Sequence, residues 1–112
     1  LLLDPTNFKT AGQGWGVVRI VDELKQRLPW LDRLVLENDA AAAALAEAWK
    51  GAARAVENSV TVTLGTGVGV GVIANGRLIR AGRELHPEGG HIIIEHVAEE
   101  VLCECGNYGC AE

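Results

Sequence analysis

The sequence predicts an α/β fold in which helices come first and a group of short antiparallel strands follows. Residues 17–28 repeat apolar side chains at helical spacing, and residues 40–55 are rich in alanine, the strongest helix former. From residue 59 onward β-branched side chains dominate, interrupted by glycine and by the turn-forming pair Asn75-Gly76. The predicted order is helix, strand, helix and then a β meander.

The helical half of the chain contains a strand between its two helices. Residues 17–28, VVRIVDELKQRL, predict an amphipathic helix, because their charges lie opposite the apolar face. In DRLVLEND, residues 34–36 predict a short apolar strand, and the alanine-rich residues 40–55 predict the second helix. Asn38 and Asp39 are therefore expected where a strand ends and a helix begins.

The second half predicts a largely antiparallel meander. We expect strands at Ser59–Leu64 and Val68–Ala74, a tight turn at Asn75-Gly76, and a third strand that starts at Arg77. A loop then leads to another strand at Ile92–Glu95, just before the cysteines.

Composition excludes several classes of function. The net charge is −5 with a pI near 5.2, and the lysines and arginines are scattered, so the chain has no electrostatic footprint for nucleic acid or an anionic membrane. The longest apolar run, GTGVGVGVIA, is far shorter than the ~20 residues that cross a bilayer. No signal segment opens the chain. We expect a soluble, cytoplasmic protein that acts on small molecules.

All three cysteines lie in CECGNYGC, at Cys103, Cys105 and Cys110. An odd number of thiols argues against a disulfide framework, whereas zinc takes nitrogen and sulfur ligands in a tetrahedron. Gly106 and Gly109 allow the sharp turns that such a loop needs. The motif therefore predicts a zinc site, against the alternative of cysteines clustered by chance.

The fourth zinc ligand should be a histidine. His86, His91 and His96 are the candidates, and local spacing alone does not choose among them. A site closed by four protein ligands is structural rather than catalytic, because no coordination position is left for water.

Two further features have both a functional and a structural interpretation. The glycines of LGTGVGVG, residues 64–71, suit either close approach of a phosphate or a plain hairpin, and a Walker loop is excluded because no Gly-Lys-Ser/Thr ending follows. Asp39 could accept a proton from a substrate hydroxyl or could simply cap a helix. Glu88 and Glu112, taken alone, are ordinary solvated charges.

Four segments together resemble the ROK family of bacterial sugar kinases and sugar-responsive repressors. They are LENDAAAAALAE, VTLGTGVGVGVIANGRLIRAG, HPEGGH and CECGNYGCAE, and the resemblance spans roughly residues 34–112. It implies an actin-like, hexokinase-type (ribonuclease H-like) ATPase fold, of which this chain is a central portion with a structural zinc loop. Residues 1–57 would end the small lobe, which carries the catalytic Asp, and residues 58–112 would begin the large lobe.

The resemblance also implies a role for each matching residue. His91 would complete the zinc site with the three cysteines and would also bind the sugar. Asp39 would be the general base that deprotonates the attacking hydroxyl, and Mg²⁺ would bridge the phosphates of ATP. The residues that would bind sugar hydroxyls are Asn38, Asp39, Glu88, His91 and Glu112. The residues that would contact the phosphates of ATP are Gly65, Thr66 and Gly67.

Departures from the family pattern qualify the implied activity. Ala41 replaces a common asparagine, and His86-Pro87 resembles the fructokinase branch although the cysteine cluster resembles glucokinases and repressors. The family's N-terminal phosphate loop and adenine-binding part do not occur in these 112 residues, so we expect no kinase activity from them alone.

Three functions follow from the resemblance. The first is an ATP-dependent hexose kinase, a cytoplasmic homodimer that binds neither nucleic acid nor membrane. The second is the sugar-sensing domain of a ROK repressor, and the third is a freestanding zinc-stabilised sugar-binding module. The intact LGTGVG segment favours the kinase, because repressors tend to lose it.

Overall fold

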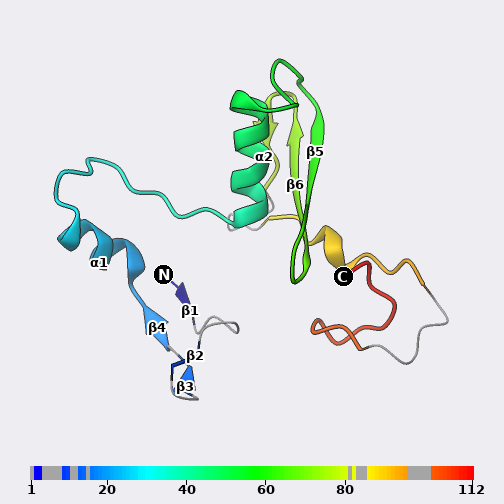
Figure 1. The fold of residues 1–112 in the computed structure, drawn as a ribbon, viewed down its shortest axis with the longest axis horizontal. Helices are drawn as coiled ribbons and strands as arrows, with labels where there is room; N and C mark the ends of the chain where they lie inside the picture. Colours follow the sequence, from blue (N-terminus) through cyan, green and yellow to red (C-terminus); the bar gives the residue numbers. More distant parts are fainter. Residues whose placement is uncertain are drawn as a thin grey trace. The chain divides into compact units, whose positions relative to one another are not determined.

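The computed structural model describes residues 2–3, 9–10, 13–14, 16–80, 82, 86–95 and 102–112 (Figure 1). The chain divides into two compact units, residues 1–36 and 37–112, and each is described by itself. Within the described residues, neither helix reaches the length and apolar character that a membrane crossing needs.

The first unit contains two pairs of very short strands and one helix. Strand β1 (Leu2–Leu3) pairs antiparallel with β4 (Val17–Val18), and β2 (Lys9–Thr10) with β3 (Gln13–Gly14). Helix α1 runs over Ile20–Arg27, so the prediction of a helix from residue 17 was wrong at its start. Acidic residues in the first turn and basic residues in the last turn of α1 match the helix dipole over these shorter bounds.

The strand predicted at residues 34–36 is absent: residues 33–38 have no regular structure. Val35 and Leu36 are exposed, and no described segment pairs with them. An apolar run becomes a strand only when a neighbouring strand pairs with its backbone N–H and C=O groups. The apolar pattern of residues 34–36 does not show whether such a neighbour exists, so it predicted a strand that does not form.

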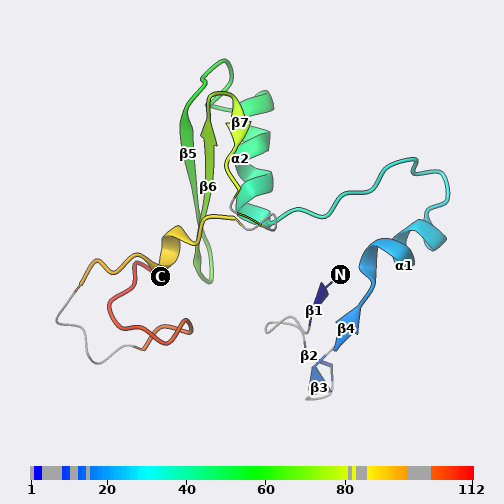
Figure 2. The same cartoon turned by 180° about the vertical axis from the view of Figure 1, so that it is seen from behind.

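The second unit packs helix α2 (Asp39–Lys50) on a sheet of three strands (Figure 2). These are β5 (Ser59–Leu64), β6 (Val68–Ala74) and β7 (Arg77–Leu78), antiparallel in the order β5-β6-β7. The predicted strands and the turn are confirmed. Asn75 and Gly76 adopt φ of 50° and 69°, the left-handed values that a tight hairpin turn requires.

Helix α2 ends earlier than the alanine-rich sequence predicts. It stops at Lys50 and is capped by Gly51, rather than continuing to residue 55. The Glu47 carboxylate accepts a hydrogen bond of 2.7 Å from the amide of Ala52, and Ala55 has a left-handed φ of 64°. Glycine inside a helix costs about 1 kcal/mol relative to alanine, so Gly51, whose backbone is extended, favours an end of the helix at this point.

Small residues let α2 lie very close to β6. Ala40 and Ala44 are almost completely buried, at 1% and 0% exposure. A Cβ atom added to Gly71 would lie 2.4 Å from the carbonyl oxygen of Ala40, and one added to Gly69 would lie 2.9 Å from the Ala40 Cβ. The glycines of β6 therefore place the first turn of α2 against the second strand of the Gly-rich hairpin, which consists of β5, residues 65–67 and β6.

We expect Gly71→Ala to destabilise the protein by about 1–3 kcal/mol, because the backbone atom it meets cannot move aside as a flexible side chain could. Urea unfolding of the complete gene product measures the change. Gly65→Ala is the matched control, since a Cβ there meets nothing within 4 Å. Equal stability of the two variants would contradict the close packing of α2 on β6.

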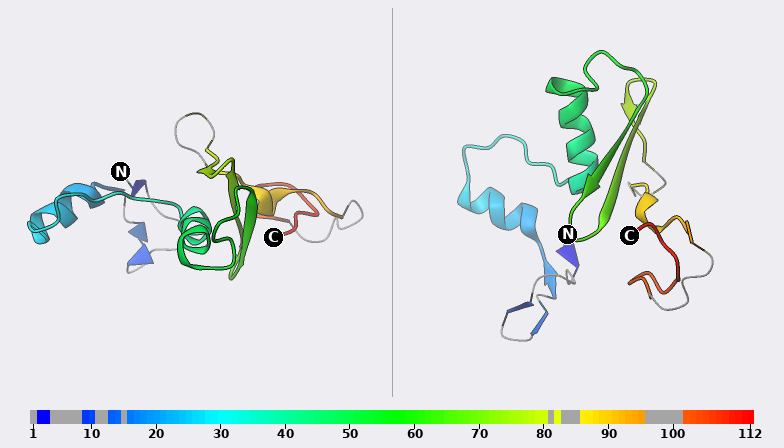
Figure 3. Two further views of the ribbon diagram at one scale, coloured as in Figure 1. Left: turned by 90° about the horizontal axis from the view of Figure 1, so that it is seen from above. Right: turned by 45° about the vertical axis from the view of Figure 1, so that its right-hand side comes forward.

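The C-terminal segment folds back beside the 3-10 turn η2 (Gly89–His91), as Figure 3 shows. The strand predicted at Ile92–Glu95 is wrong, since only an isolated bridge joins Ile93 to Cys110. The amide of Ala111 donates to the carbonyl of Ile92 at 3.0 Å, but Gly109, at φ 74°, bends the partner chain. A bent partner interrupts the regular ladder that a longer strand needs.

Candidate functional site

The N-terminus of α2 carries two polar side chains in different roles. Asn38 is the N-cap, and its Oδ1 accepts a hydrogen bond of 3.0 Å from the amide of Ala41. Asp39 is the first residue of the helix, is exposed, and accepts a hydrogen bond of 2.9 Å at its Oδ1 from the Ala40 amide. Because Asn38 caps the helix, Asp39 is not needed as the cap.

An ion pair between Glu37 and Arg80 lies next to the N-terminus of α2. The sequence did not predict this ion pair. An Arg80 Nη2 donates to Glu37 Oε2, while Glu37 Oε1 accepts a hydrogen bond of 3.0 Å from the Asn38 amide. Both side chains are largely shielded, with 34% and 20% exposed. The segment after β7 is thereby tied to the residue that precedes Asp39.

His86 joins α2 to the segment around η2. Its Nε2 lies 3.2 Å from Asn38 Nδ2 and 3.0 Å from Glu88 Oε1. His86 was one of the three histidines predicted as possible metal ligands, and the structure places it with Asn38 and Glu88 instead. His96 lies outside the described residues.

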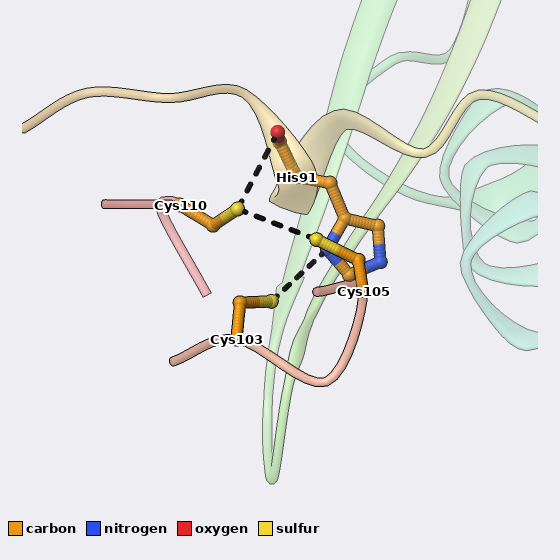
Figure 4. Close-up of side chains that lie close together, drawn as sticks. All are labelled: His91, Cys103, Cys105 and Cys110. Carbon is orange, nitrogen blue, oxygen red and sulfur yellow. Dashed lines mark hydrogen bonds between the residues drawn. The ribbon is translucent and has the colours of Figure 1, made fainter. Parts of the chain in front are cut away.

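His91 gathers with the three cysteines in one cluster (Figure 4). Its Nδ1 lies 3.5 Å from Cys103 Sγ, and Cys105 Sγ lies 3.6 Å from Cys110 Sγ. The Cys110 thiol donates to the backbone carbonyl of His91 at 3.6 Å. The four ligand atoms all lie within 4.8 Å of one another.

The loop that carries the cysteines is shaped by local turns. The amide of Cys103 donates to Asn107 O at 2.9 Å, and the amide of Gly106 donates to Cys103 O at 2.9 Å. Gly106 and Gly109 have φ of 90° and 74°, and a Cβ on Gly109 would lie 1.8 Å from the carbonyl oxygen of Glu95. Both glycines adopt the sharp, left-handed turns that were predicted, and at residue 109 a Cβ atom would also clash with the backbone.

The donor set fits a zinc ion. Zinc–sulfur bonds of about 2.3 Å in a tetrahedron put neighbouring sulfurs about 3.8 Å apart. The separation of 3.6 Å between Cys105 Sγ and Cys110 Sγ is already near this value. The other ring nitrogen of His91, Nε2, faces Glu88 Oε2 at 3.8 Å, so a carboxylate stands on the far side of the imidazole.

The thiols differ in acidity. A backbone hydrogen bond at Asn107 lowers the pKa of the Cys105 thiol, assisted by the thiols of Cys103 and Cys110 and by the His91 charge, against the opposing effect of burial. Burial, and then hydrogen bonds to Cys105 and Cys103, raise the pKa of Cys110 to about 12. In metal-free protein Cys105 should therefore lose its proton at a lower pH than Cys110.

This order predicts the alkylation of metal-free protein. At neutral pH, iodoacetamide should modify Cys105 faster than Cys110 by at least about tenfold, because the thiolate is the nucleophile. The lowered pKa leaves more thiolate at Cys105, whereas Cys110 should react readily only as the pH approaches its raised pKa. Tandem mass spectrometry locates the label, and urea-unfolded protein, with equal rates, is the control. Earlier labelling of Cys110 would overturn the assignment.

Glu112 sits beneath the Gly-rich hairpin. Its Oε2 accepts a hydrogen bond of 3.3 Å from the Val68 amide, and its own amide donates to Gly90 O at 3.0 Å. A Cβ on Gly67 would lie 3.0 Å from the Glu112 carboxylate. Glu112 therefore connects the hairpin to the turn that carries His91, while Thr66 is exposed between β5 and β6.

A model of the protein family described as ROK matches residues 6–112. The chain belongs to the ROK family. The predicted family resemblance is thus confirmed, and so is the α/β character of the fold.

ROK kinases and ROK regulators are both among the relatives. A glucokinase of Thermotoga maritima is 40% identical over 98 residues, which are 88% of this chain and 30% of the relative. The transcriptional regulator NagC of Escherichia coli is 34% identical over 100 residues, 89% of this chain and 23% of the relative.

Solved ROK structures show the same division. A ROK glucokinase from Streptomyces griseus, in complex with glucose and AMPPNP, is 39% identical with a TM-score of 0.67 over 80% of this chain and 27% of its own. A ROK transcriptional regulator, a homologue of the E. coli MLC protein, is 32% identical with a TM-score of 0.71 over 89% of this chain and 24% of its own. The chain spans less than a third of each of these relatives.

The structure brings most of the predicted ROK site residues into one connected group. Contacts link Asn38 to Glu88 through His86, and Glu88 faces His91 in the cysteine cluster. Glu112 links the hairpin at Gly67 to the backbone of Gly90, next to His91. The roles of these residues toward sugar, ATP and zinc stay predictions, as does the lobe boundary between residues 57 and 58.

Proposed function

We propose that the chain forms part of an ATP-dependent hexose kinase of the ROK family. The observation that carries the proposal is the polar group that runs from Asn38 through His86 and Glu88 to His91, with Asp39 next to Asn38 in the chain and an intact Gly-rich hairpin alongside. Such a group can hold several hydroxyls of a sugar, and relatives named glucokinase support the class of reaction.

Asp39 is the proposed general base. Its carboxylate is exposed at the positive end of α2 and would accept the proton of the sugar hydroxyl as that oxygen bonds to the γ-phosphorus and the bond from phosphorus to ADP breaks. Residues 65–67 would place backbone amides beside the phosphates of ATP. Mg²⁺ bound with ATP would neutralise part of the negative charge of the phosphates.

Zinc is proposed to be structural. Cys103, Cys105, Cys110 and His91 Nδ1 would hold it, which leaves His91 Nε2 turned toward Glu88 and the sugar. The ion would thereby fix the backbone of residues 102–112, including the attachment of Glu112 beneath the hairpin. The metal would not contact the sugar; it would affect sugar recognition by holding the sugar-binding side chains in place.

The sugar-sensing domain of a ROK repressor is the second candidate. The similarity to NagC and to the MLC homologue favours it. Both functions need the sugar residues, but only the kinase needs Asp39 as a base and the hairpin as a phosphate site. The intact LGTGVG at residues 64–69 supports the kinase.

A direct assay separates these candidates. The complete gene product is incubated with ATP, Mg²⁺ and a panel of glucose, fructose, mannose and N-acetylated hexoses, and sugar phosphate and ADP are measured. We expect stoichiometric ADP and hexose phosphate with at least one sugar, glucose being the first to test. Sugar binding without turnover, together with binding to operator DNA, would replace the kinase with the repressor.

The remaining parts of the proposal concern the whole protein. We propose a cytoplasmic homodimer, with residues 1–57 ending the small lobe of a hexokinase-type fold and residues 58–112 beginning the large lobe. Light scattering of the complete gene product tests the dimer.

A further inference from the structure

His86 lies between Asn38 and Glu88, two of the residues proposed to bind the sugar. Its Nε2 is 3.2 Å from Asn38 Nδ2 and 3.0 Å from Glu88 Oε1, and its side chain is 32% exposed. The same nitrogen thus faces an amide nitrogen from α2 and a carboxylate from the segment that leads into η2.

The orientation of the Asn38 amide is fixed by its role as the cap. Because Asn38 Oδ1 accepts the hydrogen bond from the Ala41 amide, the group that faces His86 is the NH₂, which can only donate. If Nε2 of His86 accepts this hydrogen bond, it carries no proton, and two acceptors, Nε2 and the Glu88 carboxylate, then face each other. A ring nitrogen that donates to Glu88 opposes the NH₂ of Asn38.

One of the two close contacts of His86 is therefore unmatched whichever way its protons are arranged. The side chain of Glu88 is 66% exposed and that of His86 is 32% exposed, so in the free site water can take the hydrogen-bonding positions that the unmatched contact leaves open. A hydroxyl group removes the conflict when it binds there, because it donates one hydrogen bond and accepts others. The free site is thus arranged to receive a hydroxyl among these three side chains.

We propose that His86 is a further sugar-binding residue, which acts with Asn38 and Glu88 on one hydroxyl of the hexose and so helps to select the sugar. This inference rests on the proposed function, since it needs a sugar in the site. The alternative is that His86 only spaces α2 from residues 86–91 and never contacts the ligand.

Calorimetric titration of the complete gene product distinguishes the two roles. The probes are glucose and its monodeoxy analogues, each lacking one hydroxyl, or the corresponding series for the hexose of the panel that binds best. The proteins are the wild type, His86→Ala and His86→Gln. Zinc content and melting temperature of each variant report whether the fold is kept.

We expect His86→Ala to weaken binding of the parent hexose by about 10- to 100-fold. Removal of one particular hydroxyl should then cost the variant little further affinity, although it weakens the wild type, while the other analogues keep their wild-type penalties. His86→Gln, whose amide both donates and accepts, should recover part of the affinity. If His86→Ala loses zinc or stability, the same hydroxyl-by-hydroxyl comparison is made with His86→Gln.

An equal loss for every analogue would overturn the inference in favour of a positioning role, and unchanged affinity would overturn it outright. Hexose binding by the wild type shows in the same experiment whether the sugar site exists. If the wild type binds no hexose, the proposed function fails with the inference; if it binds and the variant does not differ, only the role of His86 fails.

Discussion

Cys105→Ser is expected to abolish stoichiometric zinc binding and to release the C-terminal segment. Structural zinc in small protein sites contributes roughly 10–16 kcal/mol of apparent binding free energy, and a site with one thiolate removed keeps only part of it. Among the described residues, the backbone contacts that join residues 102–112 to the segment at residues 90–95 are an isolated bridge between Ile93 and Cys110 and the hydrogen bonds around it, without a regular strand ladder. Atomic absorption on protein dialysed against a mild chelator should fall from about one zinc per chain to nearly none.

Hydrogen exchange should report the structural consequence of the same change. The amide of Ile94 donates to Gly109 O at 2.8 Å and that of Glu112 to Gly90 O at 3.0 Å, so both should lose protection when the loop is released. Glu104→Ser is the matched control, because Glu104 lies between two cysteines of the cluster but is not part of it. Zinc content that survives Cys105→Ser would exclude the four-ligand site.

Asp39→Asn should reduce turnover by about 10²- to 10⁴-fold, the usual contribution of a general base. Asparagine keeps the size of the side chain and an oxygen that can accept the Ala40 amide, so the start of α2 should be preserved. A coupled assay of ADP release should therefore show a large fall in kcat. The KM for ATP should change little, because Asp39 is not assigned to the phosphates.

The control for this variant is Asp32→Asn, which alters an exposed carboxylate of the other unit. Calorimetry should show that Asp39→Asn still binds the hexose within a few-fold of the wild type. Full turnover by Asp39→Asn would remove Asp39 from the role of general base.

Local sequence predicted the strands and the turn of the β5-β6-β7 sheet because their determinants are local, whereas the short pairs β1-β4 and β2-β3 were not predicted. The pair Asn75-Gly76 suits the left-handed turn that was found. Enrichment in β-branched residues predicted β5 but not its covered face, because Val60, Val62 and Leu64 are exposed while the Ser and Thr residues between them are half-buried. The strand at residues 34–36 failed for the opposite reason, since its existence depends on a partner that the apolar pattern does not specify. Helix α2 was predicted too long because the propensity of the alanines gave too little weight to Gly51, which favours an end of the helix.

The site shows the same division. Three closely spaced cysteines and nearby glycines predicted a metal loop, and the structure brings the thiols and a ring nitrogen of His91 within 4.8 Å of one another, while their role as zinc ligands stays a prediction. Spacing could not assign His86, because its neighbour Asn38 is 48 positions away in the sequence. The ion pair between Glu37 and Arg80 was missed for the same reason: contacts between distant segments are created by packing, here by the glycines of β6 against α2.

The central proposal is that a zinc ion held by three thiolates and one imidazole fixes the position of the residues that would bind the sugar. X-ray absorption at the zinc edge of the complete gene product tests it most directly. The account predicts three sulfur neighbours at about 2.3 Å and one nitrogen at about 2.0 Å, with the nitrogen lost in His91→Ala. A metal-free protein with full hexose affinity, or a zinc shell without nitrogen, would contradict it.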